Sequence, residues 1–450
     1  MTGSGLRCRR SPDPFLRMKM LFPEGTGKSC TFAQILKMPL QDIEIMSPVG
    51  SYESLMAAIQ GGAGSVYFGV GKLNMRARSS VNFTLDDLAK ITRICRQFNV
   101  KSYLTMNTVI LDHEIEEVHR TIDAAKLHGV TAIIASDLSV LEYAREQGVE
   151  IHISTQCNIT NISAVKFYSR YADVMVTARE LTLDQVAAIS RQIREQNIRG
   201  PKGGLVRIEI FVHGALCMAV SGKCYLSLHN HNTSANRGAC LQDCRRAYTV
   251  KDKDSDTELE IDNEYIMSPK DLKTIHILDK VLDAGVTVLK IEGRGRSPEY
   301  VKTVTRCYSE AVSAYYNGEF TPENVERWDK ELATVYNRGF WEGYYLGRKL
   351  GEWSPVHGSL ATTKKIYVGI VANYFAKSGI AHIRLDSHEI CSGDRIEIIG
   401  PTTGVYEAVV TGLVKNEQPC EIAVKGDDPT FPVSRTVRRR DKVYKIVSNK

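Results

Sequence analysis

The sequence predicts an α/β protein: a TIM-like (β/α)8 barrel with a cysteine-rich insertion, followed by a small C-terminal all-β barrel domain. Three features of the 450 residues predict it. From residue 43 onward, short apolar runs rich in β-formers alternate with longer amphipathic stretches. Four cysteines crowd into 28 residues after the seventh run. After residue 363 the helical stretches stop, and short alternating strands divided by Gly, Pro and Asp follow.

Residues 1–40 precede this pattern and show no sustained periodicity, so we expect a flexible leader there. GTGKS at 25–29 resembles a phosphate loop, but that motif needs a glycine where Phe22 stands. No apolar run approaches the roughly 18 residues that cross a bilayer. The basic interruptions at Arg17 and Lys19 also exclude a secretory signal. We therefore expect a cytoplasmic protein with no membrane association.

Nine apolar runs are candidate strands, and their alternation with helices predicts a parallel sheet. Seven strand–helix units before the cysteines and one after them suggest a closed eight-stranded barrel within residues 41–355. One candidate must then lie outside the barrel, and we choose the shortest, 264–268. Residues 298–350 are predicted to be helical with a break near 320–324, and the stretch 114–129 to place Ile115, Val118, Ile122 and Leu127 near one face. The nine runs are 43–47, 65–70, 101–106, 131–136, 150–155, 173–178, 207–212, 264–268 and 287–292.

Residues 363–450 are predicted to form the small β-barrel domain, which we expect to dock RNA. The net charge of the whole chain is +6, and seven basic residues against Asp441 lie between 435 and 450. Such a block suits phosphate contacts, although a solvated C-terminal tail explains it equally well. If Arg438, Arg439 and Arg440 lie on a strand, Arg438 and Arg440 share one face and would bind RNA.

The cysteine block is the most distinctive feature of the sequence. Its spacing is Cys-x6-Cys-x15-Cys-x3-Cys, and it comprises Cys217, Cys224, Cys240 and Cys244 within an insertion at 213–248. Structural zinc usually takes two tight pairs of ligands, and only the second pair is tight here. An iron–sulfur cluster accepts irregular spacing. The spacing favours a cluster and leaves zinc or structural thiols as alternatives.

Basic residues surround the cysteines: Lys223, Arg237, Arg245 and Arg246 are opposed only by Asp243. They would stabilise a thiolate-bound cluster or an anionic ligand, or form a solvated loop.

Polar residues follow several predicted strands, at the rim where such barrels carry their catalytic groups. Each one alone is more often a cap or an ion-pair partner, but together they suit an anionic or nucleobase ligand. No HExxH or GxSxG motif prepares a water or a serine to attack a peptide bond. The candidate catalytic residues are Arg76, Arg78, Asn107, Gln156, Asn158, Arg179, Glu180, His213, Lys290 and Glu292.

Several segments resemble the collagenase-like peptidase family, whose members are classed as peptidases of unknown catalytic type. They include NMRARSS (74–80), STQCNITN (154–161), HGALCMAVSGKC (213–224), NRGACLQDCRR (236–246) and LKIEGRGRSPEYV (289–301). The resemblance is closest to the branch that makes 5-hydroxyuridine at the tRNA wobble position. It implies a [4Fe-4S] cluster on the four cysteines and prephenate as co-substrate. Relatives hydroxylate a ribosomal RNA cytidine or support quinone hydroxylation, and the family label implies proteolysis of collagen.

The residues and the resemblance together predict prephenate-dependent hydroxylation of tRNA uridine, with tRNA and a small carboxylate as partners. A collagenase-like peptidase, hydroxylation of another substrate, and a non-catalytic RNA-binding scaffold are the alternatives. Four cysteine ligands leave little room for an open iron position, so the cluster would transfer electrons or shape the pocket. The sequence does not decide between these roles, and it carries no signal of oligomeric state.

Overall fold

The computed structural model describes residues 43–78, 82–249, 265–348 and 351–449. The leader predicted at 1–40 lies outside these residues. No helix in the described ranges is both long and apolar enough to cross a membrane.

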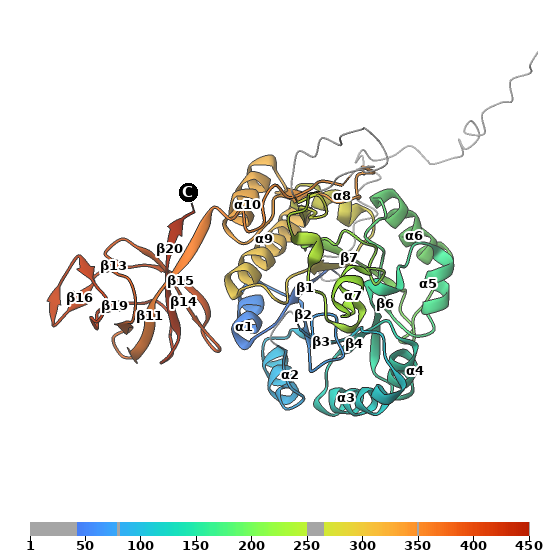
Figure 1. Cartoon of the computed structure of the whole chain (residues 1–450), viewed down its shortest axis with the longest axis horizontal. Helices are drawn as coiled ribbons and strands as arrows, with labels where there is room; N and C mark the ends of the chain where they lie inside the picture. Colours follow the sequence, from blue (N-terminus) through green and yellow to red (C-terminus); the bar gives the residue numbers. More distant parts are fainter. Residues whose placement is uncertain (1–42, 79–81, 250–264, 349–350, 450) are drawn as a thin grey trace, which may run out of the picture. The chain divides into compact units, whose positions relative to one another are not determined.

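Eight parallel strands close into a barrel surrounded by helices, as predicted (Figure 1). Each strand pairs with the next along the chain, and β9 closes the ring by pairing with both β1 and β7. Their interior side chains alternate with residues that face the helices. The barrel strands are β1 Glu44–Pro48, β2 Ser65–Gly69, β3 Lys101–Met106, β4 Ala132–Ala135, β5 Glu150–Ile153, β6 Val174–Val176, β7 Arg207–Gly214 and β9 Val288–Ile291.

The candidate run at 264–268 is not a barrel strand, which confirms that choice; its described residues, 265–268, form a turn. Strand β8 (Asp271–Lys273) follows and pairs antiparallel with the end of β7. Strand β10 (Phe340–Trp341) then adds to β8. This extension exists because β7 has eight residues, more than any other barrel strand, and its end extends beyond the barrel.

Helices follow the barrel strands and bury one face each. In α6, Thr182 and Gln185 cap the N-terminus reciprocally, and Val186, Ile189 and Ile193 are buried. The helices are α1 Tyr52–Gln60, α2 Asp87–Gln97, α3 Ile115–His128, α4 Leu138–Glu146, α5 Ile162–Tyr168, α6 Leu183–Glu195, α7 Leu226–His231, α8 Leu278–Asp283, α9 Pro298–Asn317 and α10 Pro322–Thr334.

Two helical predictions need correction. Val118 and Ile122 are buried in α3, but Leu127 is 80% exposed, because nine residues at 100° each place it opposite Val118. The break between α9 and α10 is confirmed, yet the chain is not helical from residue 335 to 348. Gly339, Gly343 and Gly347 all adopt positive φ there, which a continuous helix does not allow.

The C-terminal residues form an eight-stranded antiparallel sheet in the order β15-β14-β20-β11-β12-β19-β16-β17, which confirms the predicted all-β character. Its own core includes Val368, Ile383, Ile398 and Phe431. The strands are β11 Thr363–Phe375, β12 Ile380–Leu385, β14 Arg395–Gly400, β15 Gly404–Val409, β16 Val414–Lys415, β17 Gln418–Pro419, β19 Thr430–Pro432 and β20 Lys442–Ser448, with a separate pair β13 Ile390–Cys391 and β18 Ile422–Ala423.

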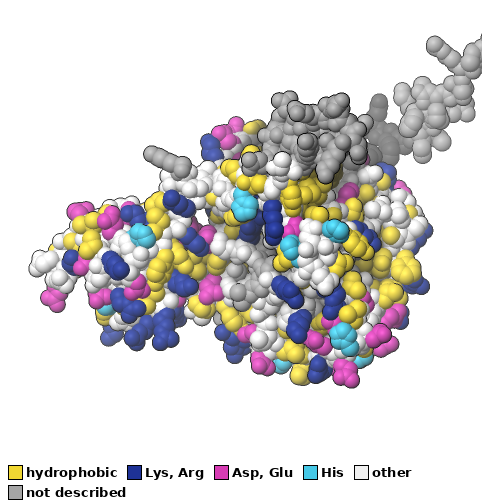
Figure 2. Space-filling view, viewed as in Figure 1, with side chains coloured by type: hydrophobic (Ala, Val, Ile, Leu, Met, Phe, Trp, Pro, Cys, Tyr) yellow, Lys and Arg dark blue, Asp and Glu magenta, His cyan; other side chains and the backbone are white. Residues whose placement is uncertain are grey.

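The arginines at 438–440 do not lie on a strand, so the expectation that Arg438 and Arg440 share one strand face is wrong. They form a turn before β20 in which Asp441 Oδ2 accepts from the Arg438 N–H at 2.7 Å. Arg440 adopts φ of +73°. All three side chains are exposed, and Figure 2 shows Lys and Arg side chains gathered at one end of the C-terminal sheet. The turn therefore presents three cations instead of two.

Candidate active site

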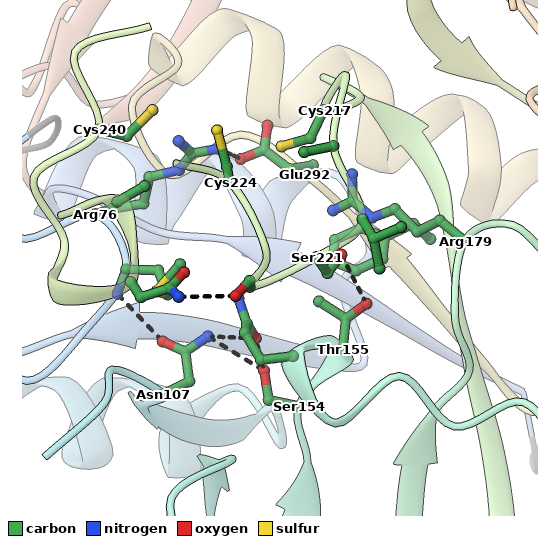
Figure 3. A pocket seen from close by; sticks show the side chains of 18 of the residues that line it. Arg76, Asn107, Ser154, Thr155, Arg179, Cys217, Ser221, Cys224, Cys240 and Glu292 are labelled. Carbon is green, nitrogen blue, oxygen red and sulfur yellow. Dashed lines mark hydrogen bonds and ion pairs between the residues drawn. The ribbon is translucent and has the colours of Figure 1, made fainter. Parts of the chain in front are cut away.

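A pocket opens at the carboxyl ends of the barrel strands, beneath the cysteine-rich insertion (Figure 3). Strands β2 to β5, β7 and β9, the loops after them and the loop after β6 supply its floor and walls, and residues 217–244 cover it. This is the end at which (β/α)8 barrels place their active sites.

The insertion is anchored to the loops that follow β2 and β3. The Arg78 N–H donates to Gly238 O at 3.1 Å, and the Arg237 guanidinium binds Glu114 at 2.6 Å. Gly238 has φ of +76°, and a Cβ there would lie 2.5 Å from Asn74 O. Only glycine therefore allows this close approach.

The predicted basic group around the cysteines serves partly to hold the insertion. Arg245 donates to Pro269 O at 2.6 Å and to Ser268 Oγ at 3.0 Å. Arg246 lies 3.4 Å from Asp243. Lys223 is exposed, and Figure 2 shows basic side chains over the region of α7. The electrostatic contribution to a ligand must therefore come chiefly from cations inside the pocket.

All four predicted cysteines line this one pocket, and none forms a disulfide. Burial raises the pKa of the Cys244 thiol to about 11; Arg245 opposes this, while Cys217, Cys240 and Cys224 raise it. The four thiols are thus close enough to interact electrostatically.

The thiols do not converge as a single metal ion requires. Zinc needs its sulfur ligands at about 2.3 Å. Among the described His, Cys, Asp and Glu residues, no group of three converges closely enough to hold one ion. Four thiols spread around one pocket suit a wider group such as an iron–sulfur cluster. The donor set therefore suits a cluster, and zinc stays the alternative.

Cations outnumber acids in the pocket lining. Arg76 pairs with Glu292 at 2.7 Å, and Lys290 pairs with the buried Glu209 at 2.7 Å. Burial raises the pKa of Glu292, but Arg76 and Arg296 outweigh it and hold that pKa at about 2. Glu292 is therefore ionised at neutral pH.

Two further arginines in the pocket have no acidic partner in the part of the chain that the structure describes. Arg179 donates to Ala215 O at 3.0 Å and lies 3.7 Å above the Phe211 ring, while its Nε has no partner. Arg294 donates to Thr105 Oγ1 at 2.8 Å. Burial lowers the pKa of Arg294 to about 10, so it remains a cation. These two charges suit a carboxylate or phosphate ligand.

Six of the ten predicted catalytic residues come together in the pocket lining, and four do not. The six are Arg76, Asn107, Gln156, Arg179, Lys290 and Glu292. Arg78 is exposed beside the undescribed residues 79–81. Asn158 donates to Ser221 O at 3.1 Å and ties the insertion to the β5 loop. Glu180 lines a smaller neighbouring pocket.

His213 is the clearest misplacement among the candidate catalytic residues. It is buried beside Tyr300, Tyr308 and Phe340, and burial lowers its pKa to about 3. The register of β7 against β9 shifts between Phe211 and His213, and such an irregularity can re-aim a side chain. A neutral, enclosed imidazole there supports packing.

Five residues that line the pocket are not among the predicted catalytic residues. They are Ser154, Thr155, Ser221, Asn236 and Arg294. Ser154 and Thr155 lie in the same segment as Gln156, directly after β5, and their position at a strand end was the available signal. Nothing in the local sequence marks Ser221 or Asn236, because they face the pocket only once the insertion has folded.

Comparison with known proteins places this site in a family. The model described as Peptidase family U32 matches residues 50–355. A Porphyromonas gingivalis protein named collagenase is 60% identical over 91% of this chain and 99% of its own length. The Bacillus subtilis tRNA hydroxylation protein P1 is 30% identical, covering 80% of this chain and 83% of that protein. The Escherichia coli 23S rRNA 5-hydroxycytidine C2501 synthase is 36% identical over 79% of this chain and 52% of its own length.

Proposed function

The chain belongs to peptidase family U32, and from that membership and its pocket we propose that it is an iron–sulfur enzyme that hydroxylates a uridine of tRNA. The observation that carries the proposal is one pocket that combines four free thiols with two arginines lacking acidic partners among the described residues. Relatives named tRNA hydroxylation proteins add support at 30% and 32% identity.

Cys217, Cys224, Cys240 and Cys244 would hold the [4Fe-4S] cluster. Such a cluster, with four cysteine ligands, would transfer electrons or shape the pocket. Around it, Arg179 and Arg294 would bind the carboxylates of prephenate, the proposed hydroxyl source. The Lys290–Glu209 and Arg76–Glu292 pairs would position these groups without adding net charge.

The target base would enter the pocket flipped out of its stack, because C5 must reach the neighbourhood of the cysteines. An anticodon loop makes that extrusion cheaper than a duplex does. The exposed turn at 438–440 would contact the RNA backbone, since three adjacent cations suit phosphates.

Proteolysis is the second candidate, favoured by 60% identity to a protein named collagenase. The pocket argues against it. No histidine is among the described residues that line it, Ser154 donates to Gln156, and Thr155 donates to Ser221 at 3.3 Å. These hydroxyls are engaged in the pocket wall and none is set against a base for attack on a peptide.

The test is the nucleoside composition of tRNA from cells that lack the encoding gene. We expect 5-hydroxyuridine and its derivatives to disappear from bulk tRNA in mass spectrometry and to return with the wild-type gene. The purified protein should leave gelatin intact. An unchanged nucleoside profile together with gelatin cleavage would reverse the ranking, and tRNA binding without an altered nucleoside would indicate a scaffold.

A further inference from the structure

One wall of the pocket consists of side-chain amides and hydroxyls whose orientation follows from a single backbone donor. The Met75 N–H donates to Asn107 Oδ1 at 3.2 Å. Because a backbone N–H can only donate, it fixes which end of the Asn107 carboxamide is oxygen. The Asn107 NH2 group therefore faces the opposite way, where it donates to Ser154 Oγ at 3.2 Å and to Gln156 Oε1 at 3.3 Å (Figure 3).

Gln156 is oriented by these neighbours in turn. An NH2 group that faces Gln156 requires a carboxamide oxygen on that side, and the Ser154 hydroxyl donates to the same oxygen. Gln156 Oε1 thus accepts two hydrogen bonds. Its Nε2 has no hydrogen-bond partner in the described ranges, so two N–H donors are left for a ligand in the pocket.

The stem of the Gln156 side chain is also held. Gly222 of the insertion has φ of +74°, and a Cβ there would lie 3.2 Å from Gln156 Cγ and 3.5 Å from Gln156 Cβ. The glutamine therefore packs against the insertion backbone two residues before Cys224. Contacts at both ends fix one rotamer, which makes Gln156 a rigid donor close to the cysteines.

We propose that Gln156 makes this pocket select a pyrimidine with a carbonyl at C4 over one with an amino group there. This inference rests on the proposed function. C4 is bonded to C5, so a pocket that brings C5 to the cysteines also brings the 4-substituent among the same residues. Uracil O4 accepts from the Gln156 N–H, whereas a cytosine amino group places donor against donor and leaves both unpaired.

Binding measurements on RNA separate this inference from catalysis. The probes are three synthetic anticodon stem-loops that carry uridine, cytidine or an abasic site at the wobble position, with affinity measured by fluorescence anisotropy under anoxic conditions. The variants are Gln156→Glu, which replaces the donors with an acceptor, and Gln156→Met, which has neither. Gln196→Glu adds the same charge at the exposed end of α6 and controls for repulsion of RNA. Urea unfolding checks that each variant folds.

We expect the wild type and Gln196→Glu to bind the uridine loop about tenfold more tightly than the cytidine loop, the discrimination of one good base contact. Gln156→Glu should prefer cytidine, and Gln156→Met should bind both alike. The inference is overturned if the wild type does not discriminate, if Gln156→Glu keeps the uridine preference, or if the abasic loop binds as well as the uridine loop. If no loop binds at all, the proposed function fails and the inference fails with it.

Discussion

The two ends of the barrel interior differ in how completely their buried charges are paired. At the amino end, the carboxylate of Glu44 binds Lys101 at 2.6 Å, Tyr103 Oη at 2.6 Å and Arg207 at 3.4 Å. At the carboxyl end, Arg179 and Arg294 have no acidic partner among the described residues. Buried charges are costly unless they are compensated. The amino end therefore holds the fold together, while the carboxyl end, where Arg76 and Lys290 are paired but Arg179 and Arg294 are not, keeps a surplus of positive charge that suits an anion.

The largest expected effect lies at the carboxyl end. Replacing any of Cys217, Cys224, Cys240 or Cys244 with alanine should remove most of the iron, because each supplies one cluster ligand. Iron and sulfide analysis of protein purified without oxygen measures this, with about four of each per wild-type chain. Cys157→Ala is the matched control, since Cys157 is half-buried but lies outside the pocket lining. A colourless wild-type protein with one zinc per chain would contradict the cluster.

A substitution at the amino end should change the stability of the protein and nothing else. Glu44→Gln removes the buried carboxylate that binds Lys101, Tyr103 and Arg207, and we expect a loss of about 3 kcal/mol in the free energy of unfolding. Urea denaturation measures this loss, and iron content should stay at the wild-type value. A change below about 1 kcal/mol, the size of a surface ion pair, would show that the amino end is not held by this compensation.

The pH dependence of stability also tests whether the Glu44 ion pairs stabilise the amino end. Burial raises the pKa of Glu44, but Lys101 and Arg207 outweigh it and hold that pKa at about 2. A depressed carboxyl pKa contributes stability that is present above the ordinary value near 4.5 and is lost as pH falls through about 2. The unfolding free energy should therefore fall between about pH 5 and pH 2, and Glu44→Gln should flatten this fall. An identical pH profile in the variant would contradict the assignment.

An intermediate effect is expected from Arg294. Arg294→Met removes a buried cation that has no acidic partner in the described structure, so stability should be unchanged or slightly higher. Affinity for prephenate, measured by calorimetry, should fall about tenfold to a hundredfold, because one carboxylate contact is lost. Lys202→Gln, an exposed residue of the amino end, should leave affinity unchanged. Unaltered affinity in Arg294→Met would mean that the anion binds elsewhere.

The smallest effect concerns the turn at the end of the C-terminal sheet. Neutralising Arg438 and Arg440 should weaken tRNA binding uniformly across sequences and reduce its log–log salt slope by about one to two. Since Arg439 is equally exposed in this turn, Arg439→Gln should weaken binding to a similar degree as either single change. Cluster content should stay normal. Equal affinity and salt slope in the double variant would show that the turn is only a solvated edge.

Strand order and the cysteine insertion could be predicted because their signals are local: alternating runs and a dense cysteine block. What failed depended on geometry that sequence does not express. The register shift in β7 just before His213 and the turn that removes Arg438–Arg440 from a strand are each a local break in regular structure. The role of Arg294 depends on its forming no ion pair among the described residues, which becomes visible only when distant segments are brought together.

The central claim is tested most directly by reconstitution from purified components. Protein prepared without oxygen is incubated with an unmodified tRNA transcript and prephenate, and the nucleosides are analysed by mass spectrometry. We predict 5-hydroxyuridine with the wild type, none with Cys240→Ala, and a normal yield per folded protein with Glu44→Gln. The account would be contradicted if the cluster-loaded wild type formed no hydroxylated nucleoside and instead cleaved gelatin, with Cys240→Ala cleaving gelatin equally well.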